Sequence, residues 1–397
     1  MLNKGALEGI RVMDFTRFIS GPYCAQLLGD LGAEVLKIEK GVGDNTRHFI
    51  PYSDDISLYF TGLNRNKHSM KIDFRKPDGI ALIKKMLTEV DVIVENFKPG
   101  TLDKMGLGRA ELDKINSDII VVHISGYGQS GPYKDRAAFD CVLEAMSGMM
   151  SMTGIEGQPP LLMGQAYLDF IAGTFGALGC LAAIISRPKH GGQDVDVAMI
   201  EAALAYSLYA PEHYLANGKI TGQFGNRDRV LSPANAFKDK NGKYVYIHSG
   251  TDPHFERLCM HIGREDLLAE DKFKYAAVRM ANAEAVEIEV QKWVGTQTAY
   301  DVEDQLAKLG IPCAVVADMS DVVKNPQLIA RNVMKTFKFP DGKEIPEVAT
   351  NLRLSKTPGQ TYKRPPLLGE DTEDVLRNTY GLTENEIQNL KDEKVID

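Results

Sequence analysis

The first 125 residues alternate short runs of β-branched residues with helical patterns, and this alternation limits the possible folds. Expected strands cover 10–15, 34–39, 69–74, 92–97 and 119–125. Expected helices between them cover 21–31, 77–90 and 102–115. Strands joined by crossover helices pair in parallel, and helices cover both faces of a parallel sheet. This region therefore predicts an α/β fold built on a parallel sheet.

The rest of the chain adds one more strand to this pattern and then changes in character. Long apolar helices are expected at 169–187 and 199–217, around a strand at 194–197. Gly, Asn and Arg cluster over 217–231, just before Pro233, and periodicity is lost there, so this stretch is interpreted as a linker.

A smaller α+β domain is expected beyond the linker. Apolar runs at 236–237 and 244–247 flank Asn241-Gly242, a strong hairpin signal. Expected helices follow at 254–262, 283–293 and 298–309. Near the end of the chain, Thr383 and Glu386 have the spacing of a capping box that opens a helix over 383–392.

Composition restricts the class of partner. The 397 residues are 44% hydrophobic and 25% charged, as in globular proteins, and the net charge of −8 has the wrong sign for a nucleic-acid-binding protein. The five cysteines are scattered without a CxxC pair, which favours a reducing, cytoplasmic location. The uncharged run 170–186 contains three glycines and is short for a membrane span, so it is interpreted as a buried helix with no membrane partner.

Two cofactor motifs are considered and rejected. Gly126-Tyr127-Gly128-Gln129-Ser130-Gly131 matches GxGxxG, but the turn-like 132–136 follows where a dinucleotide fingerprint needs a helix. The eight histidines show no ligand spacing. We therefore expect neither a nicotinamide cofactor nor a metal ion.

Asp169 is an acidic residue between Leu168 and Phe170, where the long apolar helix is expected to begin. An aspartate there commonly caps free backbone N–H groups. A carboxylate on apolar walls at a positive helix end is also fixed and poorly hydrated, and hence a usable nucleophile towards an acyl group. The pattern leaves both interpretations open.

Basic residues follow several expected strands. They are Lys40, Arg75, Lys98 and Lys104. Each is explained by ordinary solvated charge, but the carboxyl ends of parallel strands are also where α/β sheets bind ligands. A basic cluster at that edge suits a small polyphosphate such as a nucleotide or coenzyme A (CoA).

Several longer segments resemble one known family. The strongest are IRVMDFTRFISGPYCAQLLGDLGAEVLKIEK, NRNKHSMKIDF, DVIVENFKPGTLDKMG, HISGYGQSGP, GQDVDVAM, GIPCAVV, NPQLIARN and PPLLGEDTEDVL. Together they identify the chain as similar to the class III coenzyme A transferases, the formyl-CoA/oxalate and carnitine CoA-transferase family, over nearly its whole length.

The resemblance implies an architecture and an activity. It implies a nucleotide-binding-like large domain made from both termini, residues 1–218 and 328–397, with a small α+β domain inserted at 219–327. It also implies an interlocked homodimer. The implied reaction moves CoA between organic acids through an aspartyl mixed anhydride and an aspartyl-CoA thioester, with CoA as a substrate and no tightly bound cofactor.

Site residues are carried over from the resemblance position by position. Asp169 falls at the place of the family's nucleophile, and Asp140 would orient it. The implied CoA contacts are Lys40, Ile72, Arg75, Asn96, Phe97 and Lys104. The implied substrate pocket contains Phe18, Ile19 and Phe139.

Departures from the family pattern bear on the substrate. Phe18 and Ile19 replace the valine and glutamine of oxalate-type enzymes, so the pocket is more apolar and oxalate is disfavoured. The glycine-rich loop of the formyl-CoA enzyme has no counterpart between Val230 and Lys243, which places the chain nearer the carnitine-type members. Asp371 stands where many relatives have histidine, and no function is assigned to it.

Two alternatives are weighed. Acyl-CoA racemases of the same fold resemble the segment RAAFDCV but place histidine immediately before the aspartate, where this chain has Phe139. Racemisation needs two bases, and a phenyl ring exchanges no proton, so transfer is favoured. The other alternative is a catalytically silent CoA-binding protein.

Overall fold

The computed structural model describes residues 5–397 and divides the chain into two compact units. The first unit contains residues up to 149 together with 162–218 and 329–397. The second contains residues 150–161 and 219–328. The short segment 150–161, which we expected in the large domain, therefore belongs to the second unit.

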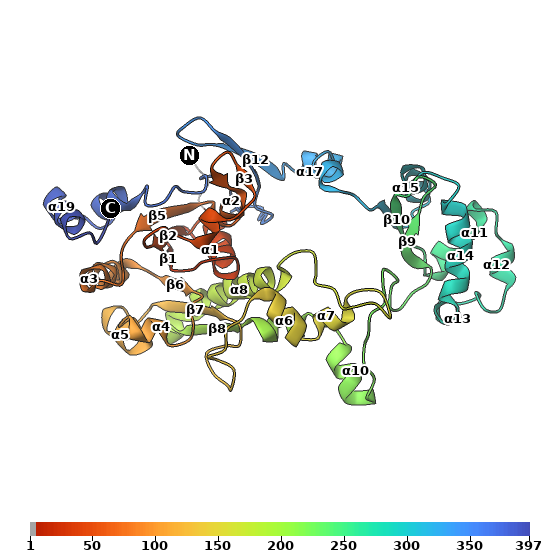
Figure 1. Cartoon of the computed structure of the whole chain (residues 1–397), viewed down its shortest axis with the longest axis horizontal. Helices are drawn as coiled ribbons and strands as arrows, with labels where there is room; N and C mark the ends of the chain where they lie inside the picture. Colours follow the sequence, from red (N-terminus) through yellow and green to blue (C-terminus); the bar gives the residue numbers. More distant parts are fainter. Residues whose placement is uncertain (1–4) are drawn as a thin grey trace. The chain divides into compact units, whose positions relative to one another are not determined.

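A six-stranded sheet forms the centre of the first unit (Figure 1), and all its strands are parallel, as predicted. The strand order is β5-β2-β1-β6-β7-β8. The strands are β1 (Arg11–Asp14), β2 (Glu34–Glu39), β5 (Lys67–Lys71), β6 (Val92–Glu95), β7 (Ile120–Ser125) and β8 (Asp194–Ala198). The order reverses between β1 and β6, and ligands of open α/β sheets bind at the carboxyl ends of strands at such a switch point.

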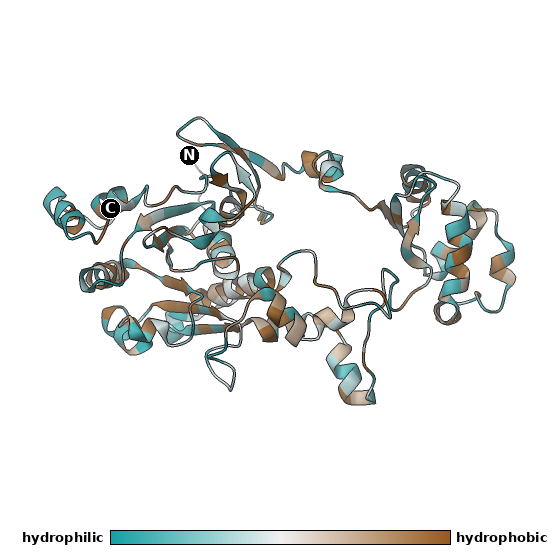
Figure 2. Cartoon of the chain, in the orientation of Figure 1, coloured by the Kyte–Doolittle hydropathy of each residue, from teal (hydrophilic) through white to brown (hydrophobic). Residues whose placement is uncertain are grey.

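Helices cover both faces of the sheet because successive strand side chains point to opposite faces. Val12 and Val92 belong to one apolar core, whereas Met13 and Ile93 belong to the other. The first core packs against α1 (Ser20–Asp30), α6 (Asp140–Met146), α8 (Tyr167–His190) and α9 (Met199–Ala205). The second packs against α3 (Pro77–Met86), α4 (Thr101–Lys104), α5 (Arg109–Ile115), α18 (Thr372–Asn378) and α19 (Glu384–Asp392). Figure 2 shows hydrophobic colour along the strands between these layers.

Several element boundaries differ from the expectation, and three of the differences have a local explanation. The helix expected over 102–115 is α4 and α5, separated by a turn in which Gly106 has a φ of +71°. The helix expected over 199–217 is α9 and α10 (Ala210–Asn217), with Leu208 between them at a φ of +53°. Strand β5 begins at Lys67, two residues early, because the Lys67 side chain is buried in an ion pair that the pattern does not indicate.

Smaller elements complete the first unit. They are the 3₁₀ turns Asn45–His48 and Leu87–Glu89, β3 (Tyr52–Ser53), β4 (Ile56–Ser57), α2 (Leu58–Asn64), β12 (Met334–Lys338) and β13 (Glu344–Val348). The predicted capping box of α19 is confirmed, since the Thr383 and Glu386 side chains each bond the other's backbone N–H.

The second unit contains a three-stranded antiparallel sheet in the order β11-β10-β9. Its strands are β9 (Ala234–Lys238), β10 (Tyr244–His248) and β11 (Cys313–Val315). Its helices are α11 (Asp252–His261), α12 (Asp266–Ala269), α13 (Ala276–Ala281), α14 (Ala283–Val294), α15 (Ala299–Lys308) and α16 (Met319–Val322). Two short helices cross the unit boundaries, α7 (Met149–Met152) and α17 (Pro326–Ala330). The predicted hairpin at Asn241-Gly242 joins β9 to β10, with Gly242 at a φ of +91°.

Helix α8 is the one helix within residues 5–397 that is long and apolar enough to cross a membrane. Length and composition alone do not distinguish a membrane span from a core helix. Leu168, Ala172 and Cys180 on α8 are buried in the first apolar core, so we interpret α8 as a core helix of this unit. Leu178 and Ile185 on the same helix are 58% and 80% exposed.

Candidate active site

Residues 15–20 form the turn between β1 and α1 at the switch point of the sheet. Phe18 in this turn has a φ of +67°, a left-handed conformation that costs a non-glycine residue free energy. The Phe18 N–H donates to the Asp44 carboxylate at 3.3 Å, and the Lys37 ammonium donates to the Thr16 carbonyl at 2.9 Å. These bonds hold the turn in the conformation that Phe18 requires.

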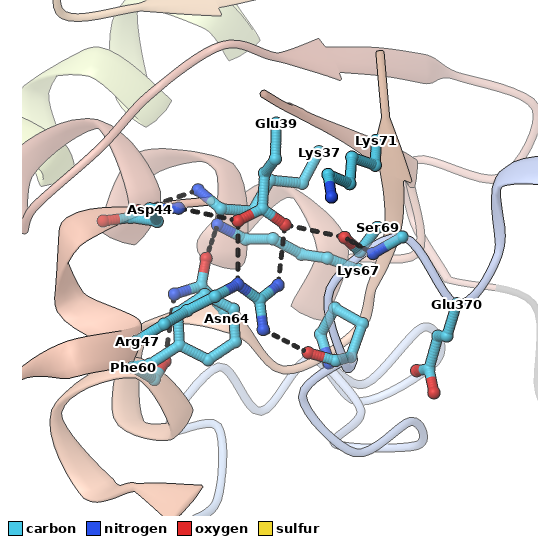
Figure 3. A network of polar contacts seen from close by, with 12 residues as sticks. Lys37, Glu39, Asp44, Arg47, Phe60, Asn64, Lys67, Ser69, Lys71 and Glu370 are labelled. Carbon is cyan, nitrogen blue, oxygen red and sulfur yellow. Dashed lines mark hydrogen bonds and ion pairs between the residues drawn. The ribbon is translucent and has the colours of Figure 1, made fainter. Parts of the chain in front are cut away.

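A buried network of ion pairs and hydrogen bonds includes Lys37, Glu39, Asp44, Arg47, Asn64, Lys67 and Ser69 (Figure 3). Lys37 pairs with Asp44 at 3.0 Å, and Lys67 pairs with Asp14 at 2.9 Å. Burial lowers the pKa of Lys67 to about 8, although Asp14 favours its charged form. Buried charges are tolerated only when they are paired in this way, so the network fixes the ends of β1, β2 and β5 in place.

Arg47 anchors the same network to the C-terminal part of the chain. Its guanidinium bonds both oxygens of the Glu39 carboxylate, at 2.8 and 2.6 Å, and donates to the Pro366 carbonyl at 2.9 Å. Burial opposes ionisation of Glu39, but the bonds to Arg47 lower the pKa of this carboxyl to about 2. Glu39 thus stays ionised throughout the neutral range.

Asp169 is the third residue of α8, and the helix is preceded by Ala166 without a side-chain cap. Asp169 is therefore not the capping residue, which removes one of the two interpretations left open by the pattern. The hydroxyl and the backbone N–H of Ser20, at the start of α1, lie close to its carboxylate and favour the ionised form. Burial and the negative Asp140 raise the pKa of Asp169 to about 6, against the effect of Ser20. Two helix N-termini thus face one half-buried carboxylate.

Glycines on α8 explain how the two helix ends come so close. A Cβ at Gly173 would lie 2.5 Å from the Ser20 carbonyl oxygen, and one at Gly176 would lie 3.1 Å from the Cys24 sulfur. Without side chains there, α1 packs directly onto the α8 backbone. Gly173 and Gly176, which interrupt the apolar run in the sequence, therefore allow the close packing that positions Ser20 against Asp169.

Asp140 begins α6 and contacts Asp169 through the backbone. One Asp140 carboxylate oxygen accepts the Asp169 N–H at 3.1 Å. One turn along α6, the buried Glu144 accepts the Met163 N–H at 3.0 Å and lies close to the Asp140 carboxyl. The sequence-predicted pair Asp140 and Asp169 is therefore brought together, with a third carboxyl behind it.

Aromatic rings form an apolar wall close to these carboxyls. The ring of Phe18 lies 5.9 Å from that of Phe139 and 6.3 Å from that of Phe49. Phe49 in turn contacts Tyr59 at 5.5 Å. Burial and the nearby Asp169 and Asp140 raise the pKa of Tyr59, so this residue lies near the carboxyl pair. Ile19 is buried at the start of α1.

A cavity of about 280 Å³ lies at the carboxyl ends of β1, β2 and β6. Lys40, Arg75 and Phe97, three of the sequence-predicted CoA contacts, line it. The Lys40 ammonium lies 4.5 Å from the centre of the Phe74 ring, and burial together with Arg75 lowers the pKa of Lys40. The exposed Arg75 pairs with Asp73 at 2.7 Å.

The other three predicted contacts do not line this cavity. Asn96 exchanges two hydrogen bonds with the backbone of Arg17, a residue that does line it. Ile72 is fully buried in the second core, and Lys104 is exposed at the end of α4. Thus the structure gathers Lys40, Arg75, Asn96 and Phe97 at one place and leaves Ile72 and Lys104 outside the cavity.

Residues 15–20 connect the two parts of the site. Phe15, Thr16 and Arg17 line the cavity, whereas Phe18 contacts the aromatic wall and Ser20 contacts Asp169. No group of histidine, cysteine, aspartate and glutamate side chains within residues 5–397 could hold a metal ion. Residues 15–20 thus connect a cavity lined by Lys40 and Arg75 to the half-buried carboxylate of Asp169.

Comparison with known proteins gives the family. The model of CoA-transferase family III matches residues 7–372, and this chain belongs to that family. It is therefore a class III CoA-transferase, and CoA is one of its substrates.

Characterised relatives cover the chain almost completely. The succinyl-CoA–D-citramalate CoA-transferase of Chloroflexus aurantiacus is 34% identical over 98% of this chain and 98% of its own length. The formyl-CoA:oxalate CoA-transferase of Rhodopseudomonas palustris is 32% identical over 99% and 97%. A CaiB/BaiF family protein from Brucella suis has a similar solved structure, with 31% identity, a TM-score of 0.84 and coverage of 94% of this chain and 98% of its own.

Proposed function

We propose that this CoA-transferase moves CoA between organic acids through covalent intermediates on Asp169. The observation that carries the proposal is the position of Asp169 at the N-termini of both α1 and α8, beside Asp140 and the aromatic wall. A carboxylate held there is fixed and poorly hydrated, which suits nucleophilic attack on a thioester. Asp140 orients it through the Asp169 N–H.

The reaction proceeds in two symmetric halves. The Asp169 carboxylate attacks the donor thioester carbon, the C–S bond breaks, and a mixed anhydride and the CoA thiolate form. The thiolate then attacks the Asp169 carbonyl carbon, which releases the donor acid and leaves an aspartyl-CoA thioester. The acceptor carboxylate repeats these steps in reverse and leaves as its CoA thioester. One thioester replaces another, so no ATP is consumed.

We place the CoA phosphates and adenine in the cavity next to residues 15–17. Lys40 and Arg75 supply positive charge there, Phe97 offers a ring for stacking, and Asn96 fixes Arg17. Ile72 and Lys104 are assigned to CoA by resemblance only. The thioester end of the acyl-CoA then lies along residues 18–20 and reaches Asp169.

We further propose an acceptor acid that is larger or less polar than oxalate. Ile19 supplies no hydrogen bond, and the rings of Phe18 and Phe139 pack against each other beside the carboxyls. Several relatives are named for succinyl-CoA as the donor, including the succinyl-CoA:glutarate CoA-transferase of Homo sapiens. Succinyl-CoA is therefore the first donor to test, against acceptor acids of graded length and polarity.

We also propose that the enzyme is an interlocked homodimer. Apolar side chains of α8 and α10 are left largely exposed, with Ile185 at 80% and Leu215 at 83%. A groove of about 400 Å³ lined by α8, β8 and α9, including Phe175 and Leu178, is also apolar. Exposed apolar surface of this extent is typical of a protein interface, and a second copy is the occupant we assign to it.

Trapping of the intermediate tests the assignment of Asp169. Wild-type enzyme incubated with succinyl-CoA and hydroxylamine should carry a hydroxamate on Asp169, detected by peptide mass spectrometry. Asp169→Ala should keep its melting temperature, form no adduct and lose transfer. Substantial transfer by Asp169→Ala would exclude the mechanism. Incubation in deuterated buffer serves as the control for racemisation, since a racemase alone would exchange the α-hydrogen.

A further inference from the structure

Glu144 is a buried acid that the proposed mechanism does not use. Its side chain belongs to α6, one turn after Asp140, and the residue is only 1% exposed. An isolated ionised carboxylate in such a place would be strongly disfavoured, because it would lose its hydration without gaining a partner. Its presence behind the catalytic pair therefore requires an explanation from its contacts.

The contacts of Glu144 require a proton. Its carboxyl lies close to that of Asp140, one turn away on the same helix, and two buried carboxylates this close are strongly disfavoured unless one of them is protonated. One proton is therefore shared within the pair. The remaining Glu144 oxygen accepts the Met163 N–H at 3.0 Å, which agrees with the carbonyl oxygen of a neutral acid.

The surroundings place this proton on Glu144 rather than on Asp140. Asp140 is the first residue of α6, where the helix dipole favours an anion, and it also accepts the Asp169 N–H. Glu144 is more deeply buried than Asp140, with exposures of 1% and 9%. Burial and the negative Asp140 also raise the pKa of Glu144, in agreement with this placement.

We propose that Glu144 is a positioning residue that stays protonated at neutral pH, donates its proton to the Asp140 carboxylate and holds the segment leading into α8 through the Met163 N–H. The proposal rests on the assignment of Asp169 as the nucleophile. A neutral Glu144 leaves Asp140 with two donors and a single orientation. An ionised Glu144 would instead repel Asp140 and bring a third negative charge towards Asp169.

The other groups near the pair come from three helices. Asp169 faces it from α8 and Tyr59 from α2. Helix α9, which packs against α6, buries only the apolar Met199, Ala202 and Ala203. No positive side chain is among the groups that shift the pKa of Glu144, and of these groups only the Met163 N–H favours its ionised form.

Two variants separate positioning from mere space filling. Glu144→Met fills a similar volume but offers no donor to Asp140 and no acceptor to the Met163 N–H, so kcat should fall at least about tenfold while KM for acyl-CoA is unchanged. Glu144→Gln supplies both groups without a titratable proton, so it should recover kcat to within about threefold of wild type at pH 7. If kcat of the wild type falls at alkaline pH, this fall should be absent in Glu144→Gln. Thermal melting confirms that both variants are folded.

Infrared spectroscopy provides a readout that is independent of activity. The wild-type spectrum at pH 7 minus that of Glu144→Gln should contain the carbonyl band of a protonated carboxylic acid. The absence of this band, an equal loss of kcat in both variants, or full activity in Glu144→Met would each overturn the proposal. Failure of the Asp169 mechanism would appear separately, as transfer by Asp169→Ala with the band still present.

Discussion

The reactivity of Asp169 depends on its neighbours at the scale of single residues. Burial and Asp140 both raise its pKa, whereas Ser20 stabilises its ionised form. The resulting pKa of about 6 leaves the nucleophile mostly ionised at pH 7 while keeping it poorly hydrated. Asp140 and Ser20 therefore act on both the charge and the orientation of the carboxylate.

A pH profile tests this balance. The rate constant kcat/KM should fall as the pH drops through about 6, because protonated Asp169 is no longer a nucleophile. Asp140→Asn removes the like charge but keeps an oxygen for the Asp169 N–H, so the acid limb should move to lower pH. Steady-state kinetics between pH 4.5 and 8 measure the shift. A limb that stays in place or moves upward would contradict the role given to Asp140.

Sequence reasoning found some site residues and missed others for a physical reason. Asp169 stands out because it is a lone charge in an apolar helix. Tyr59 and Glu144 lie far from it along the chain in unremarkable local patterns, and only the tertiary fold places Tyr59 beside the carboxyl pair. Asp44 is similar, since its bond to the Phe18 N–H spans 26 residues and leaves no local signal.

At the scale of elements, the contact between α1 and α8 determines the geometry of the nucleophile. Gly173→Ala would place a methyl group 2.5 Å from the Ser20 carbonyl oxygen and push the helices apart. We expect a loss of about 1 to 3 kcal/mol in the free energy of unfolding and a lower kcat. Urea denaturation and steady-state kinetics measure the two effects.

Gly62→Ala on α2 is the matched control for Gly173→Ala. Nothing lies within 4 Å of a Cβ at Gly62, so alanine should stabilise the helix by about 0.5 to 1 kcal/mol. Equal effects of the two substitutions would mean that close helix packing is not what fixes Ser20 against Asp169.

His123 links three strands of the sheet. It contacts Glu95 on β6 at 2.5 Å and Asp194 on β8 at 3.7 Å. Burial opposes its charged form, but Asp194 and Glu95 raise the pKa of His123 to about 9. Glu95 also accepts the Phe97 N–H, so this pair connects the sheet to the edge of the CoA cavity.

The raised pKa predicts how stability changes with pH. Because His123 gains affinity for its proton on folding, its contribution is complete below its unfolded pKa of about 6.5 and is lost as the pH rises through about 9. Compared with His123→Gln, wild type should therefore lose about 1 to 3 kcal/mol of unfolding free energy over this window. Urea denaturation from pH 6 to 9.5 measures the difference. If the unfolding free energies of wild type and His123→Gln changed in parallel with pH, the assigned role of His123 would be wrong.

Sequence periodicity predicted the strands of the sheet but not every element boundary. The parallel strands were predictable because apolar runs and crossover helices repeat, and all expected strands of the sheet are present. The break between α9 and α10 was not predictable. Leu208 adopts a left-handed conformation there, which leucine rarely takes and which no sequence pattern indicates. The hairpin of β12 and β13, which turns at Pro340-Asp341-Gly342, was not among the expected elements.

At the scale of the whole molecule, the chain completes its first unit from segments that are distant in sequence, and the second unit is inserted between them. If two copies interlock through this arrangement, they bury more than the roughly 1,600 Å² of a standard interface, and separation requires unfolding. Sedimentation at nanomolar concentration should therefore give a dimer only. A folded, active monomer would exclude interlocking.

The last helices have a consequence for synthesis of the chain on the ribosome. Val375, Leu376 and Ile387 of α18 and α19 cover the same side of the sheet as Leu82 and Ile83 of α3. Residues 82 and 83 are translated almost 300 positions before α18 and α19. That side of the nascent sheet therefore remains partly uncovered until translation is nearly finished. A prematurely terminated polypeptide would lack α18 and α19 and would expose an aggregation-prone apolar surface to chaperones and proteases.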